Sequence, residues 1–146
     1  TPHDSMGSVG YRLSFNENGV KHEIGIATDI GFVSDAVFCG LDGCENVIVE
    51  SNHDIEMLKC GRYPYDLKKR ILSKRGHLSN TDCALLVSKL CEHGAKNILL
   101  AHLSEENNEP NVAYDEVSST IADPKINLFV ADPAEVTKLV WEDLSC

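Results

Sequence analysis

Three short apolar segments, each followed at once by an acidic or histidine side chain, constrain the fold of this chain most strongly. They read IGIATD, VIVE and NILLAH, and they end at Asp29, Glu50 and His102. Runs of this length predict buried β-strands, and segments with helical periodicity separate them. Strands that alternate with helices predict a layered α/β fold. In such a fold, ligands and catalytic groups collect just beyond the carboxyl ends of the strands, where these three side chains stand.

The remaining segments continue the alternation of strands and helices. GYRLSF and VKHEIGIAT, joined by NENG, predict a β-hairpin. Ser79 or Asn80 is the expected cap of the helix that follows GHLSN, and Pro133 is expected to open the last helix. Further strands are predicted over residues 45–51, 96–102 and 126–131, and helices over residues 32–41, 55–60, 65–75, 81–93, 111–122 and 133–144.

Length and cysteine content favour a single cytoplasmic domain. A chain of 146 residues suits one domain with one core. No apolar run approaches the roughly 20 residues of a membrane span, and no segment has the pattern of a signal peptide. The six cysteines form no C-x-x-C pair, so we expect neither a disulfide framework nor a zinc knuckle. These features predict a cytoplasmic protein without a membrane partner.

The charge of the chain is unevenly distributed. A net charge of −10 argues against a generally basic nucleic-acid binder, yet seven of the thirteen basic residues lie between Lys59 and Arg75, where only Asp66 opposes them. One interpretation is a solvated helix face. The other is an anion-binding patch, because the segment leads directly into GHLSN around His77. Under the second interpretation the candidate substrate-binding residues are Lys68, Lys69, Arg70, Lys74 and Arg75.

The polar residues at the strand ends are candidate metal ligands, each with a structural alternative. Carboxylate oxygens and imidazole nitrogens are the ligand set of zinc, manganese and iron. Asp29 can instead form a turn, and His53 can cap the helix that follows it. His77 can bond to loop backbone, and His102 can be a satisfied histidine at the edge of a sheet. The residues alone leave both interpretations open.

The order of the motifs is similar to that of a known family. HD…GY, IATDIG, VIVESNHD, GHLSN and ILLAHLSEENN resemble the later half of the metallo-β-lactamase fold, and most closely the WalJ/VicX (YycJ-like) group of bacterial hydrolases related to nucleases. The resemblance covers the chain up to about Pro133. It implies an α/β fold, the αββα four-layer sandwich, of which residues 1–146 would form the C-terminal half as a single domain with a mixed sheet and flanking helices.

The resemblance also implies a site for two divalent metal ions, zinc or manganese, on loops at the strand ends. By matching motif, His3 of PHD takes the role of a lone histidine ligand. Asp29 of TDIG takes the role of the bridging ligand, and His102 of LLAHLS that of the late histidine ligand.

Phosphodiesterase members of the family carry a further element whose histidine faces the scissile phosphate. GHLS is similar to that element, which makes His77 the candidate proton donor or phosphate clamp. Glu50 resembles the acid that orients this histidine. His53 and Asp54 form a candidate additional site, and the sequence assigns them no definite role.

One expected motif is missing. The H-x-H-x-D-H ligands of the family occur nowhere in the 146 residues, and the chain begins with Thr1. We therefore interpret the chain as an excised fragment, a proteolytic product or one part of a split protein. Alone it is expected to hold one ion or none and to be inactive. A half-fold exposes the apolar face meant for the missing N-terminal half, which predicts association with that half or self-association.

The implied activity is hydrolysis of phosphodiester bonds in DNA or RNA by a water activated between two metal ions. Two alternatives stay open. The first is hydrolysis of a small thioester, lactone or cyclic phosphodiester, against which the basic segment argues mildly. The second is a non-catalytic binding or regulatory half, which the missing ligand motif motivates.

Overall fold

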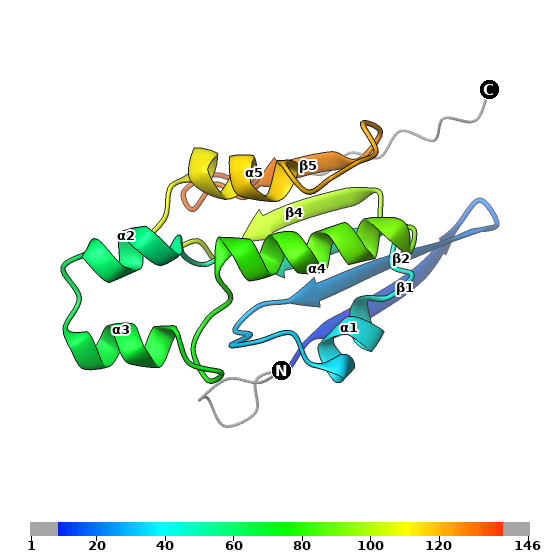
Figure 1. The fold of residues 1–146 in the computed structure, drawn as a ribbon. Coiled ribbons are helices and arrows are strands. Elements are labelled where there is room, and N and C mark those ends of the chain that lie inside the picture. Colours follow the sequence, from blue (N-terminus) through cyan, green and yellow to red (C-terminus); the bar gives the residue numbers. More distant parts are fainter. Residues whose placement is uncertain (1–8, 139–146) are drawn as a thin grey trace.

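The computed structural model describes residues 9–138, which form one five-stranded sheet with helices on one of its faces (Figure 1). In the described part of the chain two strands come first, and each later strand is preceded by one or more helices. The elements are β1 (Tyr11–Glu17), β2 (Val20–Ala27), α1 (Asp35–Leu41), β3 (Asn46–Glu50), α2 (Ile55–Cys60), α3 (Tyr65–Ile71), α4 (Asn80–Glu92), β4 (Asn97–Ala101), α5 (Pro110–Ser118) and β5 (Asn127–Val130).

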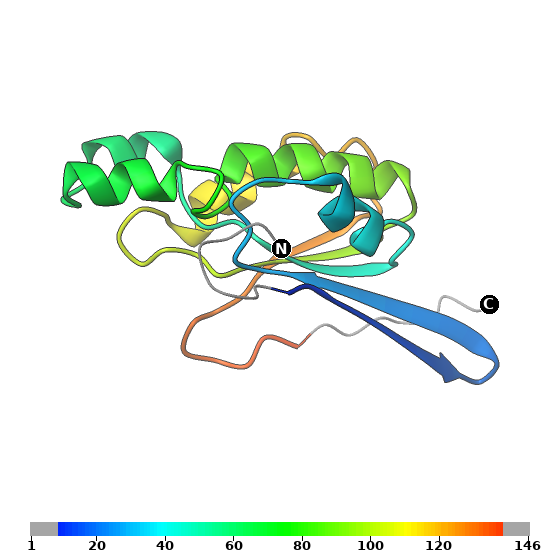
Figure 2. The same cartoon turned by 90° about the horizontal axis from the view of Figure 1, so that it is seen from below.

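The strands stand in the sheet in the order in which they occur in the chain. β1 and β2 are antiparallel and joined at Asn18 and Gly19, which both have positive φ angles, 49° and 84°. Two such residues form the turn whose twist matches that of a hairpin. β2 to β5 are parallel neighbours. Because crossovers between parallel strands are right-handed, strands added in one direction place all their helices on the same face, as Figure 2 shows.

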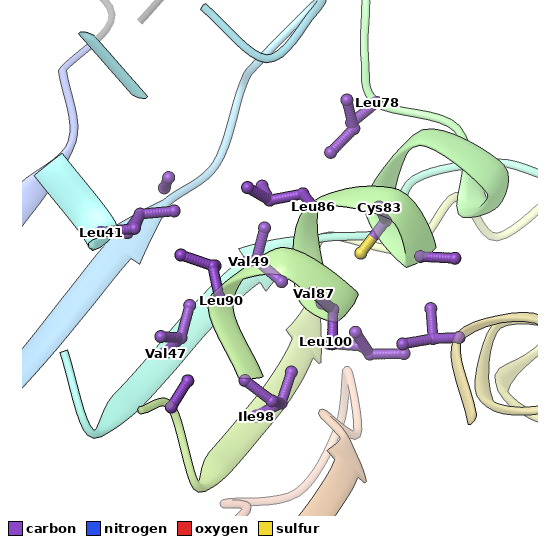
Figure 3. Packing of buried hydrophobic residues seen from close by; sticks show 14 of the residues in the cluster. Leu41, Val47, Val49, Leu78, Cys83, Leu86, Val87, Leu90, Ile98 and Leu100 are labelled. Carbon is purple, nitrogen blue, oxygen red and sulfur yellow. The ribbon is translucent and has the colours of Figure 1, made fainter. Parts of the chain in front are cut away.

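The core lies between α4 and the central strands (Figure 3). Cys83, Leu86, Val87 and Leu90 recur at the spacing of one helical face, and each is at most 2% exposed. They pack against alternate side chains of the two central strands, Val47 and Val49 of β3 and Ile98 and Leu100 of β4. Complete burial of an aliphatic side chain contributes about 1.5–3 kcal/mol to folding, so this contact is the main source of stability.

The opposite face of the sheet carries apolar side chains that no described helix covers. A Cβ at Gly25 would lie 2.7 Å from Leu41 of α1, so Gly25 faces the helices, and so does its partner Arg12. Because side chains alternate along a strand, Tyr11 and Leu13 point to the other face, where they are 59% and 50% exposed. The residues described therefore supply one sheet and one helical layer, with an open apolar face.

Most of the predicted elements are confirmed, but the helices predicted over residues 32–41, 65–75 and 111–122 are shorter than predicted, beginning at Asp35, ending at Ile71 and ending at Ser118. The helix predicted over residues 65–75 ends at Ile71, because the chain then turns back and the His77 N–H donates to the Ile71 carbonyl at 3.2 Å. The helix predicted over residues 133–144 is wrong for residues 133–138, which are irregular, and its remainder lies outside the described residues. Val136 is 86% exposed, so this segment has no apolar face to pack, and a short helix without packing is not stable.

Among residues 9–138, no helix is both long enough and apolar enough to cross a membrane.

Candidate functional site

Four side chains that the sequence singled out lie together at one edge of the sheet. The parallel strands end on the side of α2 and α3, toward which the arrowheads of β2 and β4 point in Figure 1. Asp29 follows β2, Glu50 ends β3 and His102 follows β4, while His77 arrives from the loop between α3 and α4. One ligand atom each of Asp29, His77 and His102 lies within 4.8 Å of the others. The predicted convergence is therefore present.

Glu50 is the hydrogen-bonding centre of this cluster. Its side chain is completely buried, and its Oε1 lies 2.7 Å from Nδ1 of His77 and 2.8 Å from Nδ1 of His102. Its other oxygen, Oε2, accepts the N–H of Ile30 at 2.8 Å and that of Leu78 at 3.4 Å. One carboxylate therefore connects the loops after β2, β3 and β4 with the loop before α4.

The hydrogen bonds keep the Glu50 carboxylate ionised. Burial alone would raise the pKa of Glu50, but the hydrogen bonds from His102, His77 and the Ile30 amide outweigh burial and lower the pKa below its usual value. An ionised carboxylate only accepts hydrogen bonds, so Nδ1 of each histidine carries the proton. In a neutral imidazole the lone pair is then on Nε2, the nitrogen available to a metal ion or a substrate.

Asp29 and His102 both have a backbone conformation that is rare outside glycine. Their φ angles are 54° and 56°. Such left-handed residues persist where surrounding contacts hold them, and they concentrate at functional sites. Here the carbonyl of His102 accepts a hydrogen bond from Asn52 Nδ2 at 2.8 Å. The hydrogen bond to Glu50 raises the pKa of His102, burial opposes that change, and nearby Asp29 adds to it.

Gly31 lets the Asp29 loop approach the His77 loop closely, and Gly76 lets the His77 loop fold back on the end of α3. A Cβ at Gly31 would lie 2.3 Å from the Lys74 carbonyl oxygen and 2.8 Å from the Gly76 nitrogen. A Cβ at Gly76 would lie 1.9 Å from the Ile71 carbonyl oxygen. A real side chain does not fit at either position, so both glycines are required for this backbone packing.

The segments ESNHD and GHLSN lie side by side next to the cluster and are joined by backbone hydrogen bonds. The Asn52 N–H donates to the Leu78 carbonyl at 2.9 Å, and the Asn80 N–H donates to the His53 carbonyl at 2.9 Å. Asn80 also bonds through its side chain to Ser51 Oγ at 2.7 Å. These bonds hold the loop of His77 against the end of β3, although 27 positions separate His77 from Glu50.

The donor set of the cluster fits a divalent metal ion. Asp29 supplies a carboxylate, and His77 and His102 supply imidazoles, which are ligands that zinc and manganese accept. In metal sites, carboxylates that are not themselves ligands typically orient the histidine ligands through their other nitrogen, and Glu50 bonds to Nδ1 of His77 and His102 in this way. The other predicted ligand, His3, lies outside the described residues.

Comparison with known proteins supports the same family as the motifs. No family model matches the chain. Exodeoxyribonuclease YycJ of Bacillus anthracis is 40% identical over 145 residues, which is 95% of this chain and 53% of the relative. Exodeoxyribonuclease WalJ of Streptococcus pneumoniae strain D39 is 34% identical over 128 residues, 88% of this chain and 46% of the relative. This chain is their homologue.

YycJ and WalJ belong to the metallo-β-lactamase fold family, so the predicted resemblance is confirmed. The mixed sheet with flanking helices agrees with it. The chain spans about half the length of the curated relatives it matches.

His53 and Asp54 have surroundings different from those of the cluster. Asp54 caps α2, and its side chain accepts the Met57 N–H at 2.7 Å. The ring of His53 is 1% exposed, and neither of its nitrogens has a hydrogen-bond partner among the described residues. Burial lowers the pKa of His53 to about 4, so the ring is neutral near pH 7.

The five basic residues predicted to bind substrate do not share one surface. Arg70 and Arg75 line a cleft beside His77. Lys68 donates instead to the carbonyl of Lys59 at 2.7 Å, and Lys74 lies over the ring of Phe32. Lys69 is exposed and does not line the cleft. Successive residues of α3 point in directions about 100° apart, which separates the three neighbours 68–70.

The cleft, named here the Tyr63 cleft, has a volume of about 500 Å³ and lies between α3, with the turn before it and the loop after it, and the loop after β4. Its lining includes Tyr63, Asn52, Glu105 and Glu106 in addition to both histidines. Sequence reasoning assigned none of these four a role. Asn52 lies in the motif ESNHD and the two glutamates lie in LAHLSEENN. Their position in these motifs is the only sequence feature that could have indicated a role for them.

Proposed function

We propose that the protein carrying this chain is a metal-dependent nuclease that hydrolyses phosphodiester bonds of DNA. The observation that carries the proposal is the buried Glu50, which orients His77 and His102 beside Asp29. The names of the relatives, both exodeoxyribonucleases, supply the substrate class. The two arginines of the Tyr63 cleft are suited to bind phosphate, a group that a small neutral ester or lactone lacks.

In this proposal Asp29 and His102 hold metal. Divalent ions bound there would supply a water whose pKa lies near 7, which makes hydroxide available at neutral pH. The Nδ1–H of His102 stays on Glu50 and keeps Nε2 directed away from that carboxylate. His3 is proposed as a further ligand.

His77 is proposed to meet the phosphate or the leaving oxygen. Its side chain is 23% exposed and lines the Tyr63 cleft. An imidazolium at His77 would donate its Nε2–H to the leaving oxygen while its Nδ1–H remains on Glu50. General acid catalysis of this kind is worth about 10²- to 10⁴-fold in rate.

We further propose that residues 1–146 are the C-terminal half of one metallo-β-lactamase-like domain. The chain matches about half of each relative, and its sheet has an open apolar face. The other half would cover this face and supply the remaining ligands. The chain alone is then expected to bind fewer than two ions and to self-associate, which metal analysis and light scattering would measure. Two tightly bound ions per monomer of this chain would contradict the division.

The proposed activity is tested with variants that distinguish the role of His77 from that of His102. The protein at the length of its relatives is incubated with end-labelled DNA and Mn²⁺. His77→Ala should abolish turnover and leave the metal content unchanged, whereas His102→Ala should lose metal as well. His93→Ala is the control, because His93 pairs with Asp42 at 2.7 Å and lies outside the cluster. Full turnover in the His77 variant would refute the role of His77, and failure of every DNA substrate would refute the nuclease.

A further inference from the structure

The Tyr63 cleft is lined by both histidines that bond to Glu50 and by an aromatic side chain. His77 and His102 contribute to the lining, and so does Tyr63, in the turn between α2 and α3. Half-buried Leu67 and Leu103 contribute apolar surface. The volume of about 500 Å³ falls in the range of about 300–1,000 Å³ that small-molecule sites occupy. The cleft therefore has room for one compact ligand unit next to the proposed reaction centre.

The charges that line the cleft are of both signs. Arg70 and Arg75 are cationic, and Glu105 and Glu106, from the loop after β4, are anionic and exposed. A site for phosphate groups alone would not carry two carboxylates, because they repel phosphate. A ligand with an anionic part and a separate hydrogen-bond donor can bind the two arginines with the first and the two glutamates with the second.

A nucleotide has this combination of groups. Its phosphate binds arginine, and its base stacks on tyrosine and on apolar side chains. The amino groups of cytosine, adenine and guanine donate to carboxylates. We propose that the Tyr63 cleft binds one nucleotide of the DNA strand beside the scissile phosphate, with Tyr63 against the base, Arg75 on a phosphate and the two glutamates at the edge of the base. This proposal rests on the nuclease function proposed above and names a subsite of it.

Hydrogen bonds fix the backbone at Arg75. Its backbone N–H donates to Ser73 Oγ at 3.2 Å, and Ser73 Oγ donates to the Arg70 carbonyl at 2.7 Å. The loop is thus folded back on α3, and Gly76 allows that fold. Among residues 9–138, no carboxylate forms an ion pair with the Arg75 guanidinium within 4.0 Å. The guanidinium is therefore available to a phosphate.

The experiment compares two tyrosines that stand two positions apart. Tyr63 lines the cleft, whereas Tyr65 is 77% exposed and does not. In the protein at the length of its relatives, Tyr63→Ala should raise KM for DNA about 5- to 150-fold, the effect of losing one base–aromatic stack. Tyr63→Phe should keep most of the affinity, because the ring remains. Tyr65→Ala should leave KM unchanged.

Substrates without a base show whether Tyr63 acts on the base. An oligonucleotide with an abasic residue beside the scissile phosphate should be cleaved equally by the wild type and by Tyr63→Ala. An equal loss on both substrates would mean that Tyr63 only supports the fold, and unchanged KM in Tyr63→Ala on normal DNA would overturn the subsite while the nuclease stands.

Binding of mononucleotides tests the cleft independently of turnover. Deoxycytidine monophosphate should bind the wild type more tightly than deoxyribose 5-phosphate does, and Tyr63→Ala should remove that difference. Glu105→Gln combined with Glu106→Gln should reduce the preference for deoxycytidine monophosphate over thymidine monophosphate. If DNA is never cleaved but these differences are observed, the nuclease function fails and the nucleotide site stands. Equal binding of all three ligands by the wild type would overturn the site.

Discussion

Replacement of Glu50 by glutamine tests the centre of the site with a change of one atom. The carboxylate accepts from four donors at once, Nδ1 of His77 and His102 on one oxygen and the N–H groups of Ile30 and Leu78 on the other. An amide has one accepting oxygen and one NH₂ group, which only donates. A glutamine side chain can therefore accept hydrogen bonds either from the two histidines or from the two backbone N–H groups, but not from both.

Both orientations of the amide have a calculable consequence. With its oxygen toward the histidines, the NH₂ group meets the buried N–H of Ile30, and an unsatisfied buried donor costs about 1–3 kcal/mol. With its NH₂ group toward the histidines, each imidazole must accept on Nδ1, carry its proton on Nε2 and lose its metal-binding lone pair. Including the weaker bond to Leu78, we expect the free energy of unfolding to fall by about 2–4 kcal/mol. Metal affinity should fall about 10- to 100-fold.

Urea unfolding and calorimetric titration with Mn²⁺ measure the two effects. The matched control is Glu23→Gln, because Glu23 also accepts several bonds, from Arg12, Ser14 and Lys21, but lies in β2 away from the cluster. The control should leave metal affinity unchanged. If Glu50→Gln binds Mn²⁺ as tightly as the wild type and unfolds at the same urea concentration, Glu50 does not orient the histidines as argued.

Two further changes probe the support of the site. Burial lowers the pKa of His53 from 6.5 to about 4. As the pH falls, the unfolded chain therefore takes up the proton before the folded chain does. The free energy of unfolding should decline as the pH falls from about 6.5 to about 4, by up to about 3 kcal/mol for this group. His53→Gln should flatten that decline in urea unfolding at several pH values, and an identical slope in both proteins would contradict the assignment. Gly76→Ala should lower the free energy of unfolding by about 1–3 kcal/mol, because its Cβ would collide with the Ile71 carbonyl. Gly40→Ala, with nothing within 4 Å of its Cβ, is the control, and equal effects of the two changes would refute the packing argument.

The site was predictable to the extent that it depends on strands. Asp29, Glu50 and His102 each stand where an apolar run ends, and parallel strands bring such ends to one edge. The position of His77 depends on a loop between two helices, which periodicity does not place. The motif GHLS singled it out through resemblance, and its contact with Glu50 follows from the pairing of residues 52–53 with residues 78–80.

The part of the basic segment that lines the cleft could not be predicted from the sequence. Its charge was evident, yet only Arg70 and Arg75 of the five candidates reach the cleft. The number of basic residues in a segment does not say where each side chain points. In α3, Lys68 to Arg70 are distributed around the helix axis and point in different directions. Tyr63, Glu105 and Glu106 stand in no periodic pattern that marks a cleft, so the proposed nucleotide subsite rests on their packing alone.

By itself the sequence determined the strands, most of the helices and which polar side chains follow the strand ends, because hydrophobic periodicity is a local property of the chain. Only the tertiary structure decided that Glu50 is shared by two histidines, that Gly31 lets the Asp29 loop meet the His77 loop, and that Gly76 lets the His77 loop fold back on α3. Hydrogen bonds of 2.7–2.8 Å between residues 27 and 52 positions apart require the whole sheet and α4 to be in place before the atoms come together.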